Sequence, residues 1–438
     1  MTHFAEDRVG EFASARVESI EAEMKLGRTW IAIGLLLAGP GAQAQLLPSP
    51  SATLGQTGGV VPGLLNRVDG TLDETGLDRL NPARLAEQLV AARTARITDL
   101  LRRHSDSIEL DDRKEPARRG VILLTGANPA SIETLRKAGY GVESEAVEGL
   151  DLSVTRLKVP QGRSLPRALK QVRSIAPEAE ASADNLYFPS GATPVATTMA
   201  LAASGPVRGR AVGMIDGGVA RHPSLTGEVE QRGFVRGAPK ASSHGTAVAS
   251  LISGTRIIRG AAPGAPLLAA DVYGDDPAGG SAFAIARALG WMAARGVNVV
   301  TVSLVGPDNP LLAGAIRLAQ DKGVTTVAAV GNDGPAARPA YPASYRDVVA
   351  VTGIDGRGRL LPEAGRARHV DFAAPGADMN AARSDGGKGR VRGTSFAAPL
   401  VAGRLFTTGS LSALKAEAKP GKREFGRGVI CGSCRNMD

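Results

Sequence analysis

The chain has 438 residues, of which 43% are hydrophobic and 22% charged, so it can form two or three domains and is not disordered throughout. Aromatic residues make up only 4% while there are 55 glycines, which favours close backbone packing over a large aromatic interface. The formal net charge is +9, but the basic clusters, such as 102–103 and 419–427, lack the interleaved aromatic side chains of a single-strand binder. We therefore expect a globular α/β protein with no nucleic-acid partner.

The first 44 residues predict an N-terminal extension followed by a secretory signal at 24–44. The signal has a basic start at Lys25 and Arg28, a short apolar stretch at 30–38 and a small-residue ending at 42–44. The apolar stretch is shorter than the about 20 residues that span a bilayer, and no later segment is better suited. We expect a secreted or periplasmic protein without a stable membrane span in its mature form, with an uncleaved anchor as the alternative.

Residues 45–118 predict a linker and one amphipathic helix. The stretch 45–76 is rich in Gly, Pro, Ser and Thr without a sustained period, as linkers are. Asn81 then provides an N-cap and Pro82 a first helical residue. The apolar residues that follow share one helical face: Leu85, Leu89, Ile97 and Leu101.

Residues 119–187 predict a small α+β module of the ferredoxin-like kind, which packs a sheet against two helices. We expect strands at 120–126, 140–149 and 152–160, helices at 129–138 and 164–174, and a last extended piece at 185–188. The module contains no catalytic constellation. The small residues of 188–205 predict a connector.

Residues 206–408 predict a second, larger domain. Continuous apolar runs at 211–215, 266–273, 297–304, 324–330 and 347–353 alternate with helical stretches. Buried strands that alternate with helices indicate a doubly wound, mostly parallel sheet covered on both faces. In such α/β folds, functional residues collect at the carboxyl ends of the strands.

Three polar residues fall where this rule expects them. Asp216 ends the first apolar strand, while His244 and Ser395 each begin a helix. Nucleophilic acyl transfer needs a hydroxyl, a base that accepts its proton, and a buried carboxylate that orients the base. Taken alone, Ser395 is equally well explained as a helix cap, but the three residues together predict a catalytic set.

Asn332 follows another predicted strand. Its side-chain amide and the backbone N–H of Ser395 predict two donors to the oxygen that becomes negative in a tetrahedral intermediate. The alternative is an asparagine that only shapes the turn before 333–334.

Residues 409–438 predict a C-terminal tail that holds the only two cysteines, Cys431 and Cys434. A four-thiolate zinc site is impossible with two cysteines. A local disulfide in an oxidising compartment is the better interpretation.

The polar residues lie in motifs that follow one another along the chain: DGGVARHPSL at Asp216, HGTAVAS at His244, AVGNDG at Asn332, FAAPG at 372–376 and GTSFAAP at Ser395. With these motifs the sequence resembles the subtilisin-like serine proteases (subtilases) over roughly residues 205–408. The order Asp, His, Ser is that of subtilisin and not that of chymotrypsin-like enzymes or α/β-hydrolases. The resemblance implies a serine endopeptidase that hydrolyses peptide bonds in protein or peptide substrates.

The segment SLVG, formed by Ser303, Leu304, Val305 and Gly306, is similar to the subtilase segment that pairs with the substrate and borders the specificity pocket. Val305 stands where many relatives have glycine. Its branched side chain adds bulk there, so we expect small or medium apolar residues to be preferred on the acyl side of the cut bond.

The module at 119–187 resembles a subtilase prodomain, which implies an intramolecular inhibitor and self-cleavage within 188–205. The alternative is a permanent accessory domain.

A structural calcium ion is compatible with the resemblance, but no Asp-rich loop identifies its ligands, and the chemistry requires no cofactor. We expect a monomer. The alternative function is a catalytically silent subtilase-fold protein that serves as a binding or scaffolding module.

Overall fold

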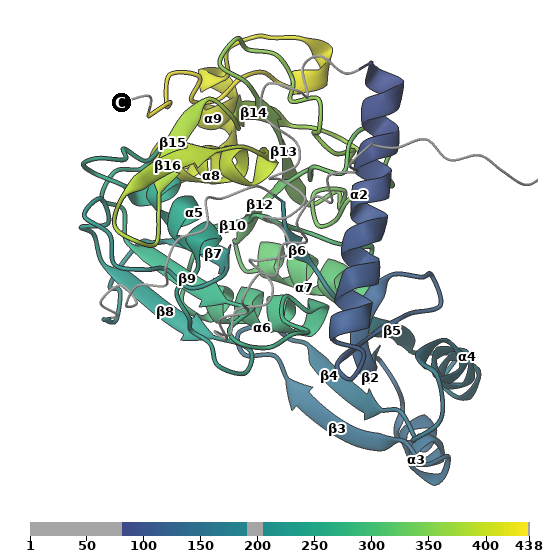
Figure 1. Cartoon of the computed structure of the whole chain (residues 1–438). Helices are drawn as coiled ribbons and strands as arrows, with labels where there is room; N and C mark the ends of the chain where they lie inside the picture. Colours follow the sequence, from purple (N-terminus) through teal and green to yellow (C-terminus); the bar gives the residue numbers. More distant parts are fainter. Residues whose placement is uncertain (1–80, 191–204, 437–438) are drawn as a thin grey trace, which may run out of the picture. The chain divides into compact units, whose positions relative to one another are not determined.

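The computed structural model describes residues 81–190 and 205–436, all of which lie in one compact unit (Figure 1). The predicted extension and signal at 1–44, the linker up to residue 80 and most of the connector lie outside the described residues. In the described part of the chain, no helix is long and apolar enough to cross a membrane.

The first described element is the predicted amphipathic helix, α2 (Pro82–Arg103). The side chain of Asn81 accepts a hydrogen bond from the backbone N–H of Ala83 at 2.9 Å. This bond satisfies one of the donors that the first turn of a helix leaves unpaired. Leu85, Leu89 and Leu100 are buried on one side of the helix. The helix therefore packs through its apolar face.

A small antiparallel sheet with two helices follows α2. Its elements are β1 (Ile108–Leu110), β2 (Pro116–Thr125), α3 (Pro129–Lys137), β3 (Gly141–Ala146), β4 (Ser153–Lys158), α4 (Leu165–Ile175) and β5 (Glu180–Asn185). The order β5–β2–β4–β3 is that of a ferredoxin-like module. The last strand of the module is β5, which lies before the extended piece that we predict at 185–188. The sequence does not reveal this strand, because its buried positions carry Ala, Ser, Asp and Asn.

The larger sheet has seven strands, all parallel, in the order β14–β13–β12–β10–β7–β9–β8. The strands are β7 (Val212–Asp216), β8 (Val229–Gly233), β9 (Leu267–Asp271), β10 (Val299–Val302), β12 (Thr325–Ala329), β13 (Val348–Ile354) and β14 (Phe372–Pro375). This arrangement confirms the predicted doubly wound α/β fold.

Helices cover both faces of this sheet. The helices are α5 (Ser243–Ser253), α6 (Ala282–Ala294), α7 (Pro310–Asp321) and α8 (Thr394–Thr408). Along β10, Val300 and Val302 pack with α6 and α7, whereas Val299 faces the cluster of α5 and α8. Burial on both faces explains why the strands appear in the sequence as continuous apolar runs.

One face of the sheet in the ferredoxin-like module packs against α6 and α7. Leu123 and Val154 of this sheet lie in the same hydrophobic core cluster as residues of both helices. At the edge of this contact, β5 lies at the amino ends of both helices. Asp184 accepts a hydrogen bond from the backbone N–H of Phe283 at 3.0 Å, and Asn309 donates to the carbonyl of Ala183 at 2.9 Å. Burial raises the pKa of the Asp184 carboxyl. The contact therefore satisfies polar groups that would otherwise be unpaired.

Two further pairs of short strands lie outside the two larger sheets. β6 (Phe188–Pro189) pairs antiparallel with β11 (Leu304–Val305), and β15 (Met379–Ala382) pairs with β16 (Lys388–Val391). The first pair links the end of the ferredoxin-like module to the predicted substrate-binding segment.

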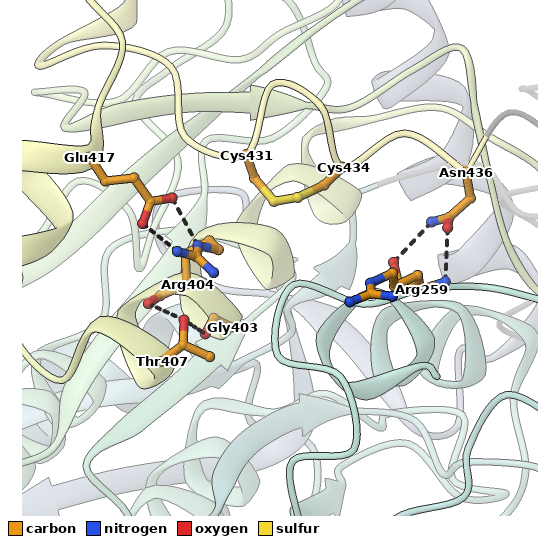
Figure 2. The surroundings of a disulfide bond; sticks show 8 residues. All are labelled: Arg259, Gly403, Arg404, Thr407, Glu417, Cys431, Cys434 and Asn436. Carbon is orange, nitrogen blue, oxygen red and sulfur yellow. Dashed lines mark hydrogen bonds and ion pairs between the residues drawn. A yellow bond between two sulfur atoms is a disulfide. The ribbon is translucent and has the colours of Figure 1, made fainter. Parts of the chain in front are cut away.

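The C-terminal segment, which the sequence analysis sets apart as a tail, packs onto the larger domain. It contains α9 (Leu411–Glu417) and a 3₁₀ turn (Arg423–Phe425), and its Ile430 is fully buried. Figure 2 shows Cys431 joined to Cys434 in a disulfide. The same view shows an ion pair between α8 and α9, formed by Arg404 and Glu417, and Asn436 bonded to Arg259. The segment therefore supports α8, the helix that carries Ser395.

Candidate active site

Asp216 and His244 are in direct contact at the carboxyl edge of the large sheet. His244 Nδ1 lies 2.9 Å from Asp216 Oδ1 and 2.8 Å from Oδ2. An ionised carboxylate only accepts hydrogen bonds, so Nδ1 carries the proton and Nε2 of the neutral ring carries a lone pair. Both side chains are buried. The pair therefore has the geometry of a histidine base held in one tautomer.

Local packing explains why His244 reaches Asp216. The Ser242 side chain caps α5 by accepting from the N–H of Gly245 at 2.9 Å, which places His244 in the first turn. A Cβ atom at Gly245 would lie 2.2 Å from the carbonyl oxygen of Gly217, the residue after Asp216. Only glycine permits this close approach between the helix and the strand end.

Ser395 lies in the first turn of α8 and is fully buried. Gly393, at the N-cap, has φ 134°, a conformation that favours glycine. The Ser395 hydroxyl donates to the carbonyl of Ser303 at 2.9 Å and lies 2.7 Å from Ser190 Oγ. His244 Nε2 is buried and has no hydrogen-bond partner among the described residues. The ring centroid of Phe396, the residue after Ser395, lies 5.3 Å from that of His244, so the first turn of α8 approaches the Asp–His pair, but no hydrogen bond joins Ser395 to His244 among the described residues.

Asn332 follows β12, and Thr394 fixes the direction of its side chain. Asn332 Oδ1 accepts from the backbone N–H of Thr394 at 3.0 Å and lies 3.1 Å from Thr394 Oγ1. With its oxygen held in this way, Asn332 directs its Nδ2 group to the carbonyl oxygen of Ser190 at 2.6 Å. The amide therefore acts as an oriented donor.

The Ser190 carbonyl oxygen has two donors. Besides Asn332 Nδ2, the backbone N–H of Ser395 donates to it at 3.1 Å. The two donors are the ones that the sequence predicts for a developing oxyanion. A carbonyl held by both donors, next to a serine hydroxyl, has the surroundings of an acyl group before attack.

The segment before Ser190 lies along the predicted substrate-binding residues. β6 pairs with β11 so that Leu304 faces Pro189 and Val305 faces Phe188. The Ser190 N–H donates to the carbonyl of Ser303 at 3.3 Å. This is the way in which an extended peptide adds a strand to an exposed edge.

Tyr187, three residues before Ser190, is fully buried at the end of this segment. Its N–H donates to the carbonyl of Gly280, and its own carbonyl accepts from the hydroxyl of Tyr273, both at 2.8 Å. Its ring lies against Gly306, where a Cβ atom would be 2.6 Å away. Its hydroxyl donates to the carbonyl of Pro307 at 2.7 Å. The Tyr187 side chain is therefore enclosed by the large domain, with Gly306 against its ring and Pro307 at its hydroxyl.

A second buried carboxylate, Asp271, lies beside Asp216 in the register of β7 and β9. Burial raises the pKa of Asp271, and the neighbouring charge of Asp216 acts in the same direction. Three backbone N–H groups, including that of Tyr273, donate to Asp271 and partly offset the cost of burial. Asp271 therefore holds the turn that carries Tyr273.

Asp216 contacts His244, and Ser395, Asn332 and Ser303 each contact Ser190. Three further contributors escape sequence reasoning. Thr394 orients Asn332, Asp271 holds the Tyr273 turn, and Ser190 occupies the site. Thr394 lies in the GTSFAAP motif, which is a sequence signal for its place beside the site. The described residues contain no group of three His, Cys, Asp or Glu side chains that could hold a metal ion.

Comparison with known proteins gives one family. Residues 208–408 match the subtilase family. Subtilisin BL of Lederbergia lenta is 34% identical over 202 residues, which cover 44% of this chain and 73% of the relative. Thermitase of Thermoactinomyces vulgaris is 33% identical over 205 residues, with the same shares covered.

Among solved structures, fervidolysin from Fervidobacterium pennivorans, a keratinolytic enzyme related to subtilisin, has a TM-score of 0.59 at 18% identity, covering 73% of this chain and 61% of its own. The epidermin leader peptide processing serine protease of Staphylococcus aureus has a TM-score of 0.55 at 16% identity, covering 72% of this chain and 97% of its own. At these identities the two structures bear on the fold alone.

Proposed function

The chain belongs to the subtilase family and is a serine endopeptidase, and on this premise we propose that Asp216, His244 and Ser395 are its catalytic triad and that its first substrate is its own chain. Asn332 and the N–H of Ser395 form the oxyanion hole. The residues 303–306 bind the acyl side of the substrate. Catalysis requires no metal or cofactor, because the hydroxyl, base and oxyanion donors are all protein groups.

The mechanism starts with a rotation of the Ser395 side chain about its Cα–Cβ bond toward His244. His244 Nε2 accepts the hydroxyl proton while Ser395 Oγ attacks the substrate carbonyl carbon, and Asp216 stabilises the imidazolium that forms. The oxyanion receives hydrogen bonds from Asn332 and from the Ser395 N–H. His244 then gives the proton to the leaving amine, and water hydrolyses the acyl enzyme by the same steps.

The observation that carries this proposal is the Ser190 carbonyl oxygen, which is held by both oxyanion donors. With this carbonyl in place, the bond that breaks is the one between Ser190 and Gly191. It lies within 188–205, the range in which the sequence predicts self-cleavage. The part before the cut, here called the pro-segment (residues up to 190), occupies the acyl side of the cleft and inhibits the enzyme until it leaves.

The N-terminal signal at 24–44 makes the protein an exported protease, secreted or periplasmic, and we propose that it acts as a monomer on protein or peptide substrates. The buried interface between the pro-segment and the helices α6 and α7 supports its role in folding. Parallel sheets assemble slowly, because their contacts are distant in sequence, and a folded partner that binds the native state favours that state.

The test is direct. Purified wild-type protein should react with a fluorophosphonate probe, and the N-terminal sequence of its larger fragment should begin at Gly191. The Ser395→Ala variant is the control for both readouts. A folded wild-type chain that is neither labelled nor cut would instead support the binding or scaffolding alternative. A fragment that begins elsewhere would overturn the assignment of the cleaved bond.

Specificity should depend on Val305. A Cβ atom at Gly331 would lie 3.3 Å from Val305 Cγ1, so this valine closes the space between β11 and the end of β12. The small side chain of Ser190 fits such a pocket. We expect wild type to prefer small or medium residues on the acyl side and Val305→Gly to accept Phe or Leu better by about tenfold or more, as filling an apolar pocket allows. A peptide library measured with both proteins checks this, and an unchanged profile would contradict it.

A further inference from the structure

Helix α2 contacts the loop that carries the oxyanion donor. Arg96 Nη2 lies 2.5 Å from Asp333 Oδ1, and Arg93 Nε lies 3.3 Å from Asp333 Oδ2. A Cβ atom at Gly334 would lie 2.7 Å from Leu89 Cδ1, so the Leu89 side chain packs directly on this glycine. These five residues form the α2 contact. It lies next to Asn332 but includes none of the catalytic groups.

The carboxyl end of α2 contacts the segment that leads to Ser190. Leu100 is buried in a cluster with Leu186 and Ala278, and Leu101 and Phe188 pack against this cluster. Ala278 belongs to the large domain, whereas Phe188 is two residues before Ser190. α2 therefore touches the catalytic domain in two places, at Asp333 and Gly334 and at Ala278.

An ionic network joins these contacts to the ferredoxin-like module. Arg93 Nη2 lies 2.8 Å from Glu115 Oε2, and Arg338 Nη1 lies 3.7 Å from Glu115 Oε1. The Glu115 side chain is buried, so its charge is screened less than that of a surface carboxylate. Arg93 thus bridges Glu115 of the pro-segment and Asp333 of the catalytic domain.

We propose that the α2 contact is a second binding surface, outside the substrate cleft, that keeps the pro-segment bound after its bond to the enzyme has been cut. The proposal rests on the proposed self-cleavage after Ser190. The whole of α2 lies before that bond and none of its contacts involves the cleaved bond itself, so hydrolysis leaves these contacts intact. The partner that the surface around Asp333 and Gly334 recognises is an amphipathic helix with two arginines on its docking side. Activity then appears only when this helix has left.

The experiment changes the pro-segment and leaves the mature enzyme identical. The full chain with R93Q and R96Q loses both arginines that reach Asp333, and glutamine retains the helix propensity of arginine. The matched control is R102Q with R103Q, because these arginines pair with Asp99 of α2 itself. Intact mass records cleavage after Ser190, and a chromogenic peptide records activity, so each chain gives a delay between the two events.

We expect cleavage in all chains and a delay that R93Q/R96Q shortens about three- to tenfold, since both partly exposed ion pairs to Asp333 are lost together with the pair between Arg93 and Glu115. The control should keep the wild-type delay. An equal delay in the two double variants would overturn the proposal, as would a wild-type chain in which cleavage and activity appear together. A chain that never cuts itself would instead refute the proposed function. If the double variant does not fold, Arg96→Gln alone should shorten the delay, and an unchanged delay would be decisive against the α2 contact.

Discussion

Replacing Ser395 with alanine is expected to leave the chain uncut and to lower peptide hydrolysis about a million-fold, the magnitude known from subtilisin itself. The loss is large because the hydroxyl forms the acyl enzyme, and neither His244 nor the oxyanion donors replace that covalent step. The intact mass of the purified chain should therefore still include the pro-segment. Hydrolysis of a fluorogenic peptide measures the remaining rate.

A matched control is Ser253→Ala, which also removes a buried serine hydroxyl, one that donates within α5 at 3.4 Å. This variant should cut itself and hydrolyse peptides as wild type does. The thermal transition of Ser395→Ala must also be recorded, because its hydroxyl bonds to Ser303 and Ser190 in the precursor. A folded Ser395→Ala chain that still cleaves itself would exclude Ser395 as the nucleophile.

Much of the large domain could be predicted from the sequence because its strands are buried on both faces. Runs such as AVGMI and VTTVAAV leave no polar alternation that would suggest an exposed sheet. β5 behaves differently. It is buried against α6 and α7, but its polar residues are satisfied by partners from the other domain, as Asp184 is by the N–H of Phe283. A pattern that depends on a distant partner is invisible to local periodicity.

The C-terminal segment shows the same limit. Its buried residues, Leu414, Phe425 and Ile430, are too far apart to form a helical or strand period. The segment is held by irregular backbone contacts, among them the N–H of Ile430 on the carbonyl of Ala373. Such contacts form only once β14 is in place, so the sequence indicates a tail where the structure has a packed layer.

The residues of the site also fall into two groups: those that a local motif predicts and those that only the tertiary structure reveals. Asp216, His244 and Ser395 each lie in a motif whose turn or cap places the side chain, so the contact between Asp216 and His244 and the place of Ser395 at a helix start could be predicted from local sequence. Ser190 has no such motif, because a single serine after Pro189 resembles any loop residue. Its place follows from the pairing of β6 with β11, which brings together residues more than a hundred positions apart. The role of α2 depends on tertiary contacts to an even greater extent.

Replacing Asn332 with alanine is expected to lower kcat about a hundred- to a thousand-fold and to leave KM nearly unchanged, a loss also known from subtilisin. The amide stabilises the charge that develops on the oxygen, so its effect is larger in the transition state than in the bound substrate. Asn332 does not have a positive φ, so alanine can adopt its backbone conformation. Self-cleavage should slow by a similar factor, seen by intact mass over time. Thr394→Val should give a smaller loss, because the backbone N–H of Thr394 still holds Asn332 Oδ1. An unchanged kcat in Asn332→Ala would remove this residue from the oxyanion hole and leave it the turn role alone.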